Sequence, residues 1–270
     1  MKTIIRAGIA GALALLAARE IAAQDANGAD ASAALAKKLQ NPVASLISVP
    51  VQGNYDTGIG PDDAARYTLN IQPVIPVSIG EKMSLIIRTI VPLVDAEAPA
   101  PGGEDLSGLG DITQSFFFSP KEPVGGWIVG AGPVLLYPSA SEDQLGAEKW
   151  AAGPTFVVLR QQKGWTYGAL GNHLWSFAGD DARGDVEATF LQPFVSFTTP
   201  KFTTYGLNTE SSYDWQTSQW IVPINASVSQ LLKFGKQPVS LAIGARYYAE
   251  RPDGAAEWGA RLVFTMLFPK

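Results

Sequence analysis

The chain has 270 residues with no cysteine and a single histidine, which excludes disulfides, thiolate metal centres and histidine-rich metal sites. A formal net charge of −5 argues against nucleic acid as a partner, because phosphate binding requires a basic surface. Beyond the short N-terminal run described next, no stretch approaches the roughly 20 apolar residues of a transmembrane helix. A membrane β-barrel remains compatible with this composition, because its strands alternate apolar and polar residues. We predict no metal and no cofactor.

The first 23 residues have the layout of a secretory signal peptide. Lys2 and Arg6 precede the apolar run 7–18 (AGIAGALALLAA), and the small residues Ala22 and Ala23 precede Gln24. A basic start, a short apolar run and small residues at the cut are typical of such signals. We predict that residues 1–23 are removed on export; the alternative is a buried N-terminal helix.

Residues 24–43 are predicted to form a short helical segment. The stretch Asp30–Gln40 (DASAALAKKLQ) places Leu35 and Leu39 on one helical face, and Asn41-Pro42 ends the helix. This segment could fill a lumen, dock at a rim or form a mobile arm.

From residue 44 to residue 270 the chain alternates with the period of a β-strand. In 67–78 (YTLNIQPVIPVS), Tyr67, Leu69 and Ile71 fall on one side, and Asn70 and Gln72 fall on the other. Similar segments recur to the end, each near the roughly 9–11 residues of a tilted membrane strand. The predicted strands are 46–55, 67–78, 83–94, 109–119, 126–137, 149–161, 165–178, 187–198, 203–215, 220–230, 239–250 and 257–268. About twelve strands, an even number, predict an all-β fold: a single transmembrane antiparallel β-barrel with a short N-terminal helix.

The predicted connections alternate between two kinds. Every second one is short and carries lysine, as in Ile79–Lys82 and Gln162–Gly164, whereas most of the others are longer and acidic, as in Asp95–Gly108. Tight periplasmic turns and long external loops are the pattern of bacterial outer-membrane barrels. The acidic loops could attract cations, but we interpret them as solvated surface.

Tryptophan positions decide between lipid and a protein core behind the apolar faces. The seven tryptophans lie at or near predicted strand ends, where an interfacial aromatic belt would place them, rather than in mid-strand. We therefore predict that the apolar side of 67–78 faces lipid. Pro73 and Pro76 each remove a ladder donor, so a bulge or local weakness is expected there.

Several stretches resemble one bacterial family. They are 39–51 (LQNPVASLISVPV), 108–120 (GLGDITQSFFFSP), 132–138 (GPVLLYP), 145–154 (LGAEKWAAGP) and 165–179 (WTYGALGNHLWSFAG). Together they are similar to outer-membrane proteins assigned to the MetA pathway of phenol degradation, whose members are often labelled transporters or mislabelled neuromedin U. The resemblance covers nearly the whole mature chain. It implies an outer-membrane barrel and passage of small, aromatic or hydrophobic compounds, and it carries no catalytic residues.

The polar faces of the strands supply the candidate functional residues, which combine charges of both signs. Such charges in a lumen shape ion and solute selectivity. The predicted lumen and selectivity residues are Arg88, Glu210, Asp214, Arg246, Glu257 and Arg261. We predict an outer-membrane channel or transporter for small molecules, in contact with lipid and lipopolysaccharide; the alternative is a closed structural barrel in which the same charges form internal ion pairs.

An enzyme is the less favoured alternative. His173 lies beside Asn172 and near Ser176, which invites comparison with an outer-membrane lipid-modifying enzyme. A serine hydrolase requires the serine against the histidine together with an oxyanion hole, and the spacing gives no sign of either. His173 is in phase with Trp165, Tyr167 and Trp175, so we interpret it as an interfacial histidine near the outer rim. We predict that the chain is not an enzyme.

Overall fold

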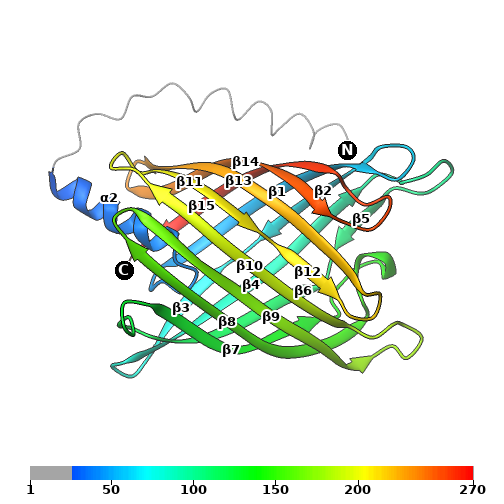
Figure 1. Ribbon diagram of the computed structural model, residues 1–270, viewed down its shortest axis with the longest axis horizontal. Helices are drawn as coiled ribbons and strands as arrows, with labels where there is room; N and C mark the ends of the chain where they lie inside the picture. The colour runs from blue at the N-terminus through cyan, green and yellow to red at the C-terminus, as the bar shows by residue number, and fades with distance from the viewer. Residues whose placement is uncertain (1–25, 270) are drawn as a thin grey trace.

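The computed structural model describes residues 26–269 and contains one α-helix and a single large sheet (Figure 1). The predicted signal peptide and residues 24–25 lie outside the described residues. Within residues 26–269, the one helix is too short and too polar to cross a membrane. The elements are α2 (Ala26–Leu39), β1 (Ile47–Ile59), β2 (Ala64–Ile71), β3 (Val74–Ile79), β4 (Met83–Ala96), β5 (Leu106–Leu109), β6 (Ile112–Pro120), β7 (Ile128–Tyr137), η1 (Asp143–Leu145), β8 (Lys149–Gln162), β9 (Trp165–Gly179), β10 (Glu187–Thr198), β11 (Thr203–Thr209), β12 (Ser211–Asp214), β13 (Gln219–Phe234), β14 (Gln237–Glu250) and β15 (Trp258–Phe268).

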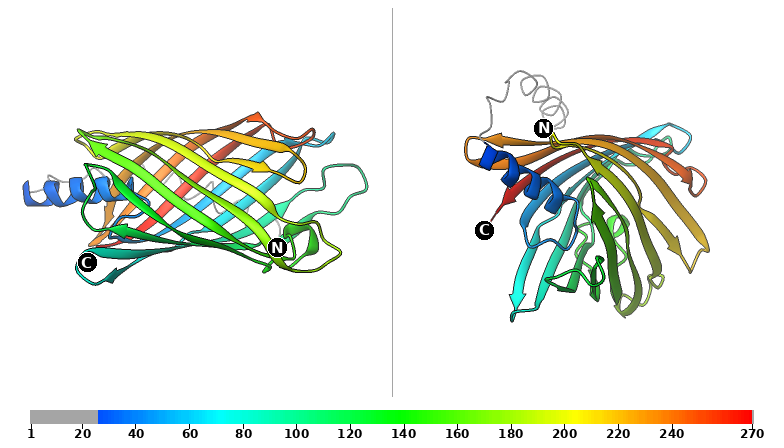
Figure 2. Two further views of the ribbon diagram at one scale, coloured as in Figure 1. Left: turned by 60° about the horizontal axis from the view of Figure 1, so that its bottom comes forward. Right: turned by 60° about the vertical axis from the view of Figure 1, so that its left-hand side comes forward.

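The strands form a closed antiparallel barrel of twelve membrane strands, as predicted (Figure 2). Three of the twelve are interrupted, so each carries two labels: β2 with β3, β5 with β6, and β11 with β12. The last strand pairs with the first, from Ile47 opposite Phe268 to Thr57 opposite Trp258, and β9 pairs with β10 to complete the circle. Closure satisfies the backbone groups that a free sheet edge would expose to lipid.

The interruption between β2 and β3 falls at the expected place. Residues 72–73 belong to neither strand, since Pro73 has no N–H to donate to the ladder. After this interruption, β3 pairs with β1 only through Val74 and Ser48. The weakness therefore lies on one side of the strand, because β3 keeps six register pairs with β4.

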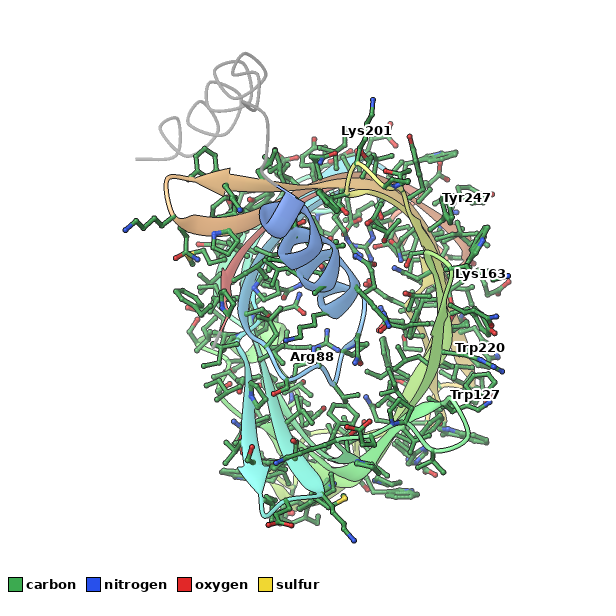
Figure 3. The ribbon with its side chains drawn as sticks, turned by 90° about the vertical axis from the view of Figure 1, so that its left-hand side faces the viewer. Arg88, Trp127, Lys163, Lys201, Trp220 and Tyr247 are labelled. Carbon is green, nitrogen blue, oxygen red and sulfur yellow. The ribbon has the colours of Figure 1, made fainter. Side chains whose placement is uncertain are left out.

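Side-chain burial confirms that the apolar faces point outward. Ile75 and Val77 are 45% and 44% exposed, whereas Gln72 on the opposite face is 6% exposed. All seven tryptophans are exposed, between 37% and 55%. Several pair with other rings near the strand ends, as Trp127 does with Tyr167 and Trp258 with Tyr247. Trp127, Trp220 and Tyr247 lie on the outer surface of the barrel (Figure 3). An apolar exterior with aromatic residues at the strand ends is the surface of a lipid-embedded barrel.

The long and short connections are distributed largely as predicted, with one difference. β1 and β2 extend further than expected, and only residues 60–63 join them, where Asp56–Arg66 was predicted as a longer loop. Their cross-strand pairs continue from Asp56 opposite Arg66 to Ile59 opposite Ala64, so the hairpin projects as paired strand. Both ends of the barrel sheet, Ile47 and Phe268, lie at the end with the short turns, which is the periplasmic end in barrels of this type.

The N-terminal segment, residues 26–46, lies at this same end of the barrel (Figures 1 and 2). Helix α2 starts earlier than the predicted Asp30 and ends before Asn41-Pro42, as expected. Leu35, Leu46 and Leu267 form one buried cluster that holds the segment to the strands.

Further along the segment, Val43 enters the lumen. It joins a second buried cluster with Ile86, Phe117 and Val157. Gly130 on β7 lies beside it, and an added Cβ there would come 3.1 Å from Val157 Cγ1, a tight contact, and 3.4 Å from Val43 Cγ1, an ordinary one. Residues 40–46 therefore turn inward instead of extending β1, which is why most of β3 has no partner on that side.

Candidate functional site

A cavity of about 470 Å³ lies inside the barrel beside the N-terminal segment. One part of its wall is polar and comes from β1, β2, β4, β10, β11, β13 and β15. Another part is apolar and includes Phe190, Phe194 and Ile90. Residues Lys38–Pro42, Ala44 and Leu46 of the N-terminal segment cover one side. The size falls within the roughly 300–1,000 Å³ of small-molecule pockets.

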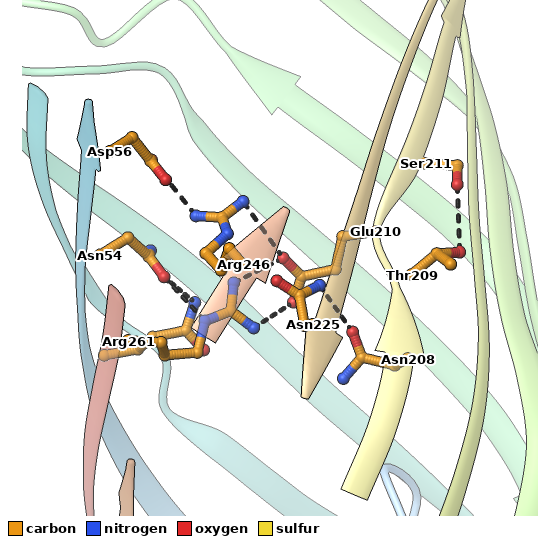
Figure 4. A network of polar contacts seen from close by, with 10 residues as sticks. Asn54, Asp56, Asn208, Thr209, Glu210, Ser211, Asn225, Arg246 and Arg261 are labelled. Atoms are coloured by element: carbon orange, nitrogen blue, oxygen red, sulfur yellow. Dashed lines mark hydrogen bonds and ion pairs between the residues drawn. The ribbon is translucent and has the colours of Figure 1, made fainter. Parts of the chain in front are cut away.

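Arg261 and Glu210 form the central ion pair of the lumen (Figure 4). Arg261 donates from Nη1 to Glu210 Oε1 at 2.8 Å and from Nη2 to Oε2 at 2.7 Å, a bidentate geometry. Its Nε donates to Asn54 Oδ1 at 2.7 Å. Every nitrogen of this guanidinium therefore has an acceptor, and the residue is only 9% exposed.

Glu210 reaches this position because it lies in phase with Asn208 on the inward-facing side of its strand. It falls between β11 and β12, and its backbone N–H donates to Pro223 O at 3.4 Å. The register with β13 is unchanged across this interruption, from Thr209 opposite Ile224 to Ser212 opposite Ile221, so the side chain of Glu210 keeps its inward direction.

Arg246 adds a second ion pair beside the first. Its Nη1 lies 3.3 Å from Asp56 Oδ2, and its Nη2 lies 3.9 Å from Glu210 Oε2. Its buried Nε has no hydrogen-bond partner among residues 26–269, nor does the buried Oδ1 of Asn225. Asn225 donates to Asn208 at 2.8 Å and lines the cavity. The Oδ1 of Asn225 can therefore accept a hydrogen bond from water or a solute in the cavity.

Arg88 lies apart from this network and points into the lumen (Figure 3). Its Nη2 donates to Gln72 Oε1 at 2.9 Å. Glu210 attracts it electrostatically, but no carboxylate of the described residues lies within 4.0 Å. Arg88, Gln72 and Asn70 all line the cavity.

The other two predicted lumen residues, Asp214 and Glu257, do not line the cavity. Asp214 accepts hydrogen bonds from the backbone of Gln216 and Thr217 and so caps the turn between β12 and β13. Glu257 precedes β15 and pairs with Arg251 at the same outer end. Four of the six predicted residues therefore gather in the lumen, and these two lie at the outer rim.

His173 and Ser176 do not form a hydrolytic pair. His173 Nδ1 lies 2.7 Å from Thr189 Oγ1, and its ring lies 4.0 Å from that of Trp175. Ser176 donates instead to Asp185 at 3.0 Å. The histidine belongs to the aromatic surface near the outer rim, as the alternation predicts.

Arg183 joins two of the external loops. Arg183 donates to the carbonyls of Asp143 at 2.7 Å and Gly146 at 2.6 Å, linking the β9–β10 loop to the β7–β8 loop. Partial desolvation, together with the neighbouring Asp143, raises the pKa of Glu148. Within residues 26–269, no three carboxylate or imidazole side chains are placed to hold a metal ion.

Sequence reasoning placed Glu210 in the lumen but did not pair the three arginines with their partners. Asn54 and Gln72 were recognisable as inward-facing by alternation, but nothing in the sequence links them to Arg261 and Arg88. Asp56 was assigned to a loop, because the extension of β1 beyond Tyr55 has no alternating signal. Contacts across 190 residues of chain, as between Asp56 and Arg246, depend on barrel closure.

Comparison with solved structures identifies the fold. A COG4313 outer-membrane channel from Pseudomonas putida F1 superposes with a TM-score of 0.65 at 13% identity, over 83% of this chain and 96% of that one. A NanC porin superposes with a TM-score of 0.52 at 11% identity, over 81% and 98%. No protein-family model and no curated protein sequence matches the chain.

The closed barrel, its lipid-facing exterior and these likenesses agree. The chain has the fold of bacterial outer-membrane channels and porins, and its apolar surface belongs in the outer membrane.

Proposed function

We propose that the protein is a channel through which small molecules cross the outer membrane by passive or facilitated diffusion. The observation that carries this proposal is the cavity of about 470 Å³ inside the closed barrel, lined by charged and amide side chains. The selectivity residues that line it are Arg88, Glu210 and Arg261, and Arg246 adjoins them through Glu210. Asp214 and Glu257 would act at the outer rim, where they influence solutes before entry.

Aromatic or hydrophobic compounds are the solutes proposed. The resemblance to proteins assigned to the MetA pathway of phenol degradation suggests this class. Phe190 and Phe194 support it, because they give the cavity an apolar wall against which a ring can pack. Lipid, with lipopolysaccharide in the outer leaflet, would surround the apolar exterior.

The N-terminal segment favours a second candidate, a closed barrel with a structural role. Val43 is 6% exposed and packs among lumen residues, and Leu35 and Leu46 fix the segment to the strands. Such packing would obstruct the periplasmic mouth for as long as the segment stays docked.

Planar-bilayer recording of the refolded mature protein, with and without residues 24–42, tests the proposal. Steady conductance of the whole chain is the expected result. Conductance only after truncation would mean that the segment is a plug. Silence in both proteins would overturn the channel proposal; the next assay would then be lipid hydrolysis, in which an enzyme would lose activity in His173→Ala.

A further inference from the structure

The charges around the cavity do not cancel, and the surplus is positive. Arg246 and Arg261 are matched by two carboxylates, Asp56 and Glu210, within 4.0 Å. Arg88 brings a third guanidinium, and its one side-chain hydrogen-bond partner in the described part of the chain, Gln72, is neutral. Lys38 of the N-terminal segment also lines the cavity. The charged groups that line or adjoin the cavity therefore carry more positive than negative charge.

Arg88 retains the capacity to bind an anion. A guanidinium offers five N–H donors in a planar fork, and Gln72 accepts from one nitrogen of this fork. Gln72 is itself only 6% exposed, so it holds the arginine in a fixed orientation. The fork geometry of arginine suits the two oxygens of a carboxylate. By contrast, Arg261 has acceptors on all three of its nitrogens and is already occupied.

The remainder of the cavity selects what such a carboxylate is attached to. Ile90, Phe190 and Phe194 line it with apolar surface, and the two phenylalanines pack against the buried cluster around Phe117. A solute body in contact with these side chains gains from leaving water only if it is apolar. Glu210 lines the same cavity and would repel a second negative charge.

We infer that Arg88 forms the binding subsite for small monocarboxylates that carry an apolar or aromatic body. This inference rests on the proposed channel function and deepens it by naming the solute class. Gln72 is the positioning residue of the subsite, and Asn70, which lines the same cavity, is a polar neighbour.

Equilibrium binding to the mature protein in detergent tests the subsite directly, with benzoate as the probe and benzamide as its neutral isostere. We expect saturable benzoate binding by titration calorimetry and at least tenfold weaker binding of benzamide. Arg88→Gln should weaken benzoate at least tenfold, while Arg88→Lys, which keeps the charge without the fork, should fall in between. The matched control is Arg160→Gln, because Arg160 lies against Trp127 on the outer surface and should leave binding unchanged.

Bilayer recordings separate failure of this inference from failure of the channel proposal. In a potassium chloride gradient, we expect the sign of the wild-type reversal potential to indicate selectivity for chloride over potassium. In Arg88→Gln, its magnitude should fall towards zero. Benzoate binding without any conductance would support the subsite and overturn the channel. Equal affinity for benzoate and benzamide, or unchanged benzoate binding in a folded Arg88→Gln variant, would overturn the subsite even in a conducting barrel. Circular dichroism establishes that each variant is folded.

Discussion

Three arginines of the described residues lie inside the barrel wall, and the partners of each determine what it can do. Arg261 is fixed by Glu210 and Asn54, and Arg246 is fixed mainly by Asp56. Among residues 26–269, Arg88 has only Gln72 as a side-chain hydrogen-bond partner. Arg261 and Arg246 therefore hold strands together, whereas Arg88 remains available to a solute.

At this scale, Arg261→Met tests the structural pair. Removing one partner of a buried ion pair destabilises a protein by about 3–5 kcal/mol. Glu210 keeps 22% of its side chain exposed and has Arg246 3.9 Å away, so we expect a loss near the lower end, about 3 kcal/mol, in the free energy of unfolding measured in urea.

A second substitution and a surface control sharpen this test. Glu210→Gln in the Arg261→Met background removes the unpaired charge and should restore at least about 1 kcal/mol. Glu257→Gln breaks an exposed pair and should change stability by less than about 1 kcal/mol. A loss in Arg261→Met no greater than in Glu257→Gln would show that the buried pair does not stabilise the barrel.

At the scale of an element, the N-terminal segment is held by side chains that the rest of the barrel provides. Leu35 and Leu46 pack near Leu267 at the end of β15, and Val43 packs inside the lumen. The segment therefore shapes one side of the cavity, and its docking and the accessibility of the lumen are coupled.

We expect Val43→Asp to release this segment. A carboxylate among Ile86, Phe117 and Val157 would be desolvated without a partner, which costs several kcal/mol or forces the side chain out of the cluster. Cleavage by trypsin at Lys37 or Lys38 should then accelerate by at least about tenfold, because undocking becomes easier by more than 1.4 kcal/mol.

The matched control is Val124→Asp. Val124 is 60% exposed in the β6–β7 turn, so the same substitution there should leave the cleavage rate unchanged. Equal rates in the two variants would contradict a docked segment.

At the scale of the whole molecule, the barrel distributes apolar and polar residues in the opposite way to a soluble protein. Its exterior carries exposed aliphatic and aromatic residues, while charged and amide groups lie buried inside. Lipid makes this arrangement stable, because the apolar exterior needs no protein partner and the closed sheet leaves few backbone groups unpaired.

Ile243→Arg measures the lipid environment directly. Ile243 is 57% exposed near the middle of β14, opposite Val228 and Leu262. Arginine on the lipid face near the bilayer midplane should lower the free energy of unfolding from lipid vesicles by about 2–4 kcal/mol. Val124→Arg, in a turn outside the bilayer, should change it by less than about 1 kcal/mol. If both substitutions had the same small effect, Ile243 would not lie in the hydrocarbon region.

Local periodicity predicted most of the fold. Alternation fixes which side of each strand faces lipid, so Ile75 and Gln72 were assigned correctly, and the tryptophans marked the strand ends. Strand limits were less predictable: β1 and β2 continue beyond the alternating segment, because pairing with each other and with their other neighbours extends both strands.

The candidate site was predicted only in part, because alternation gives the direction of a side chain and not its height in the barrel. Arg88 and Arg261 were recognisable as lumen residues, but Asp214 and Glu257 lie too near the outer end to reach the cavity. Glu210 was also recognisable as a lumen residue, but its contact with Arg261, 51 residues further along the chain, depends on how the barrel closes.

The sequence by itself determined a twelve-stranded barrel with an apolar exterior, because a two-residue period and interfacial aromatic residues are local properties of the chain. Only the tertiary structure decided which charges meet across the lumen, that Val43 enters it, and that no carboxylate of the described residues lies within 4.0 Å of Arg88. Those outcomes depend on the stagger between strands far apart in the chain, which is set when the sheet closes.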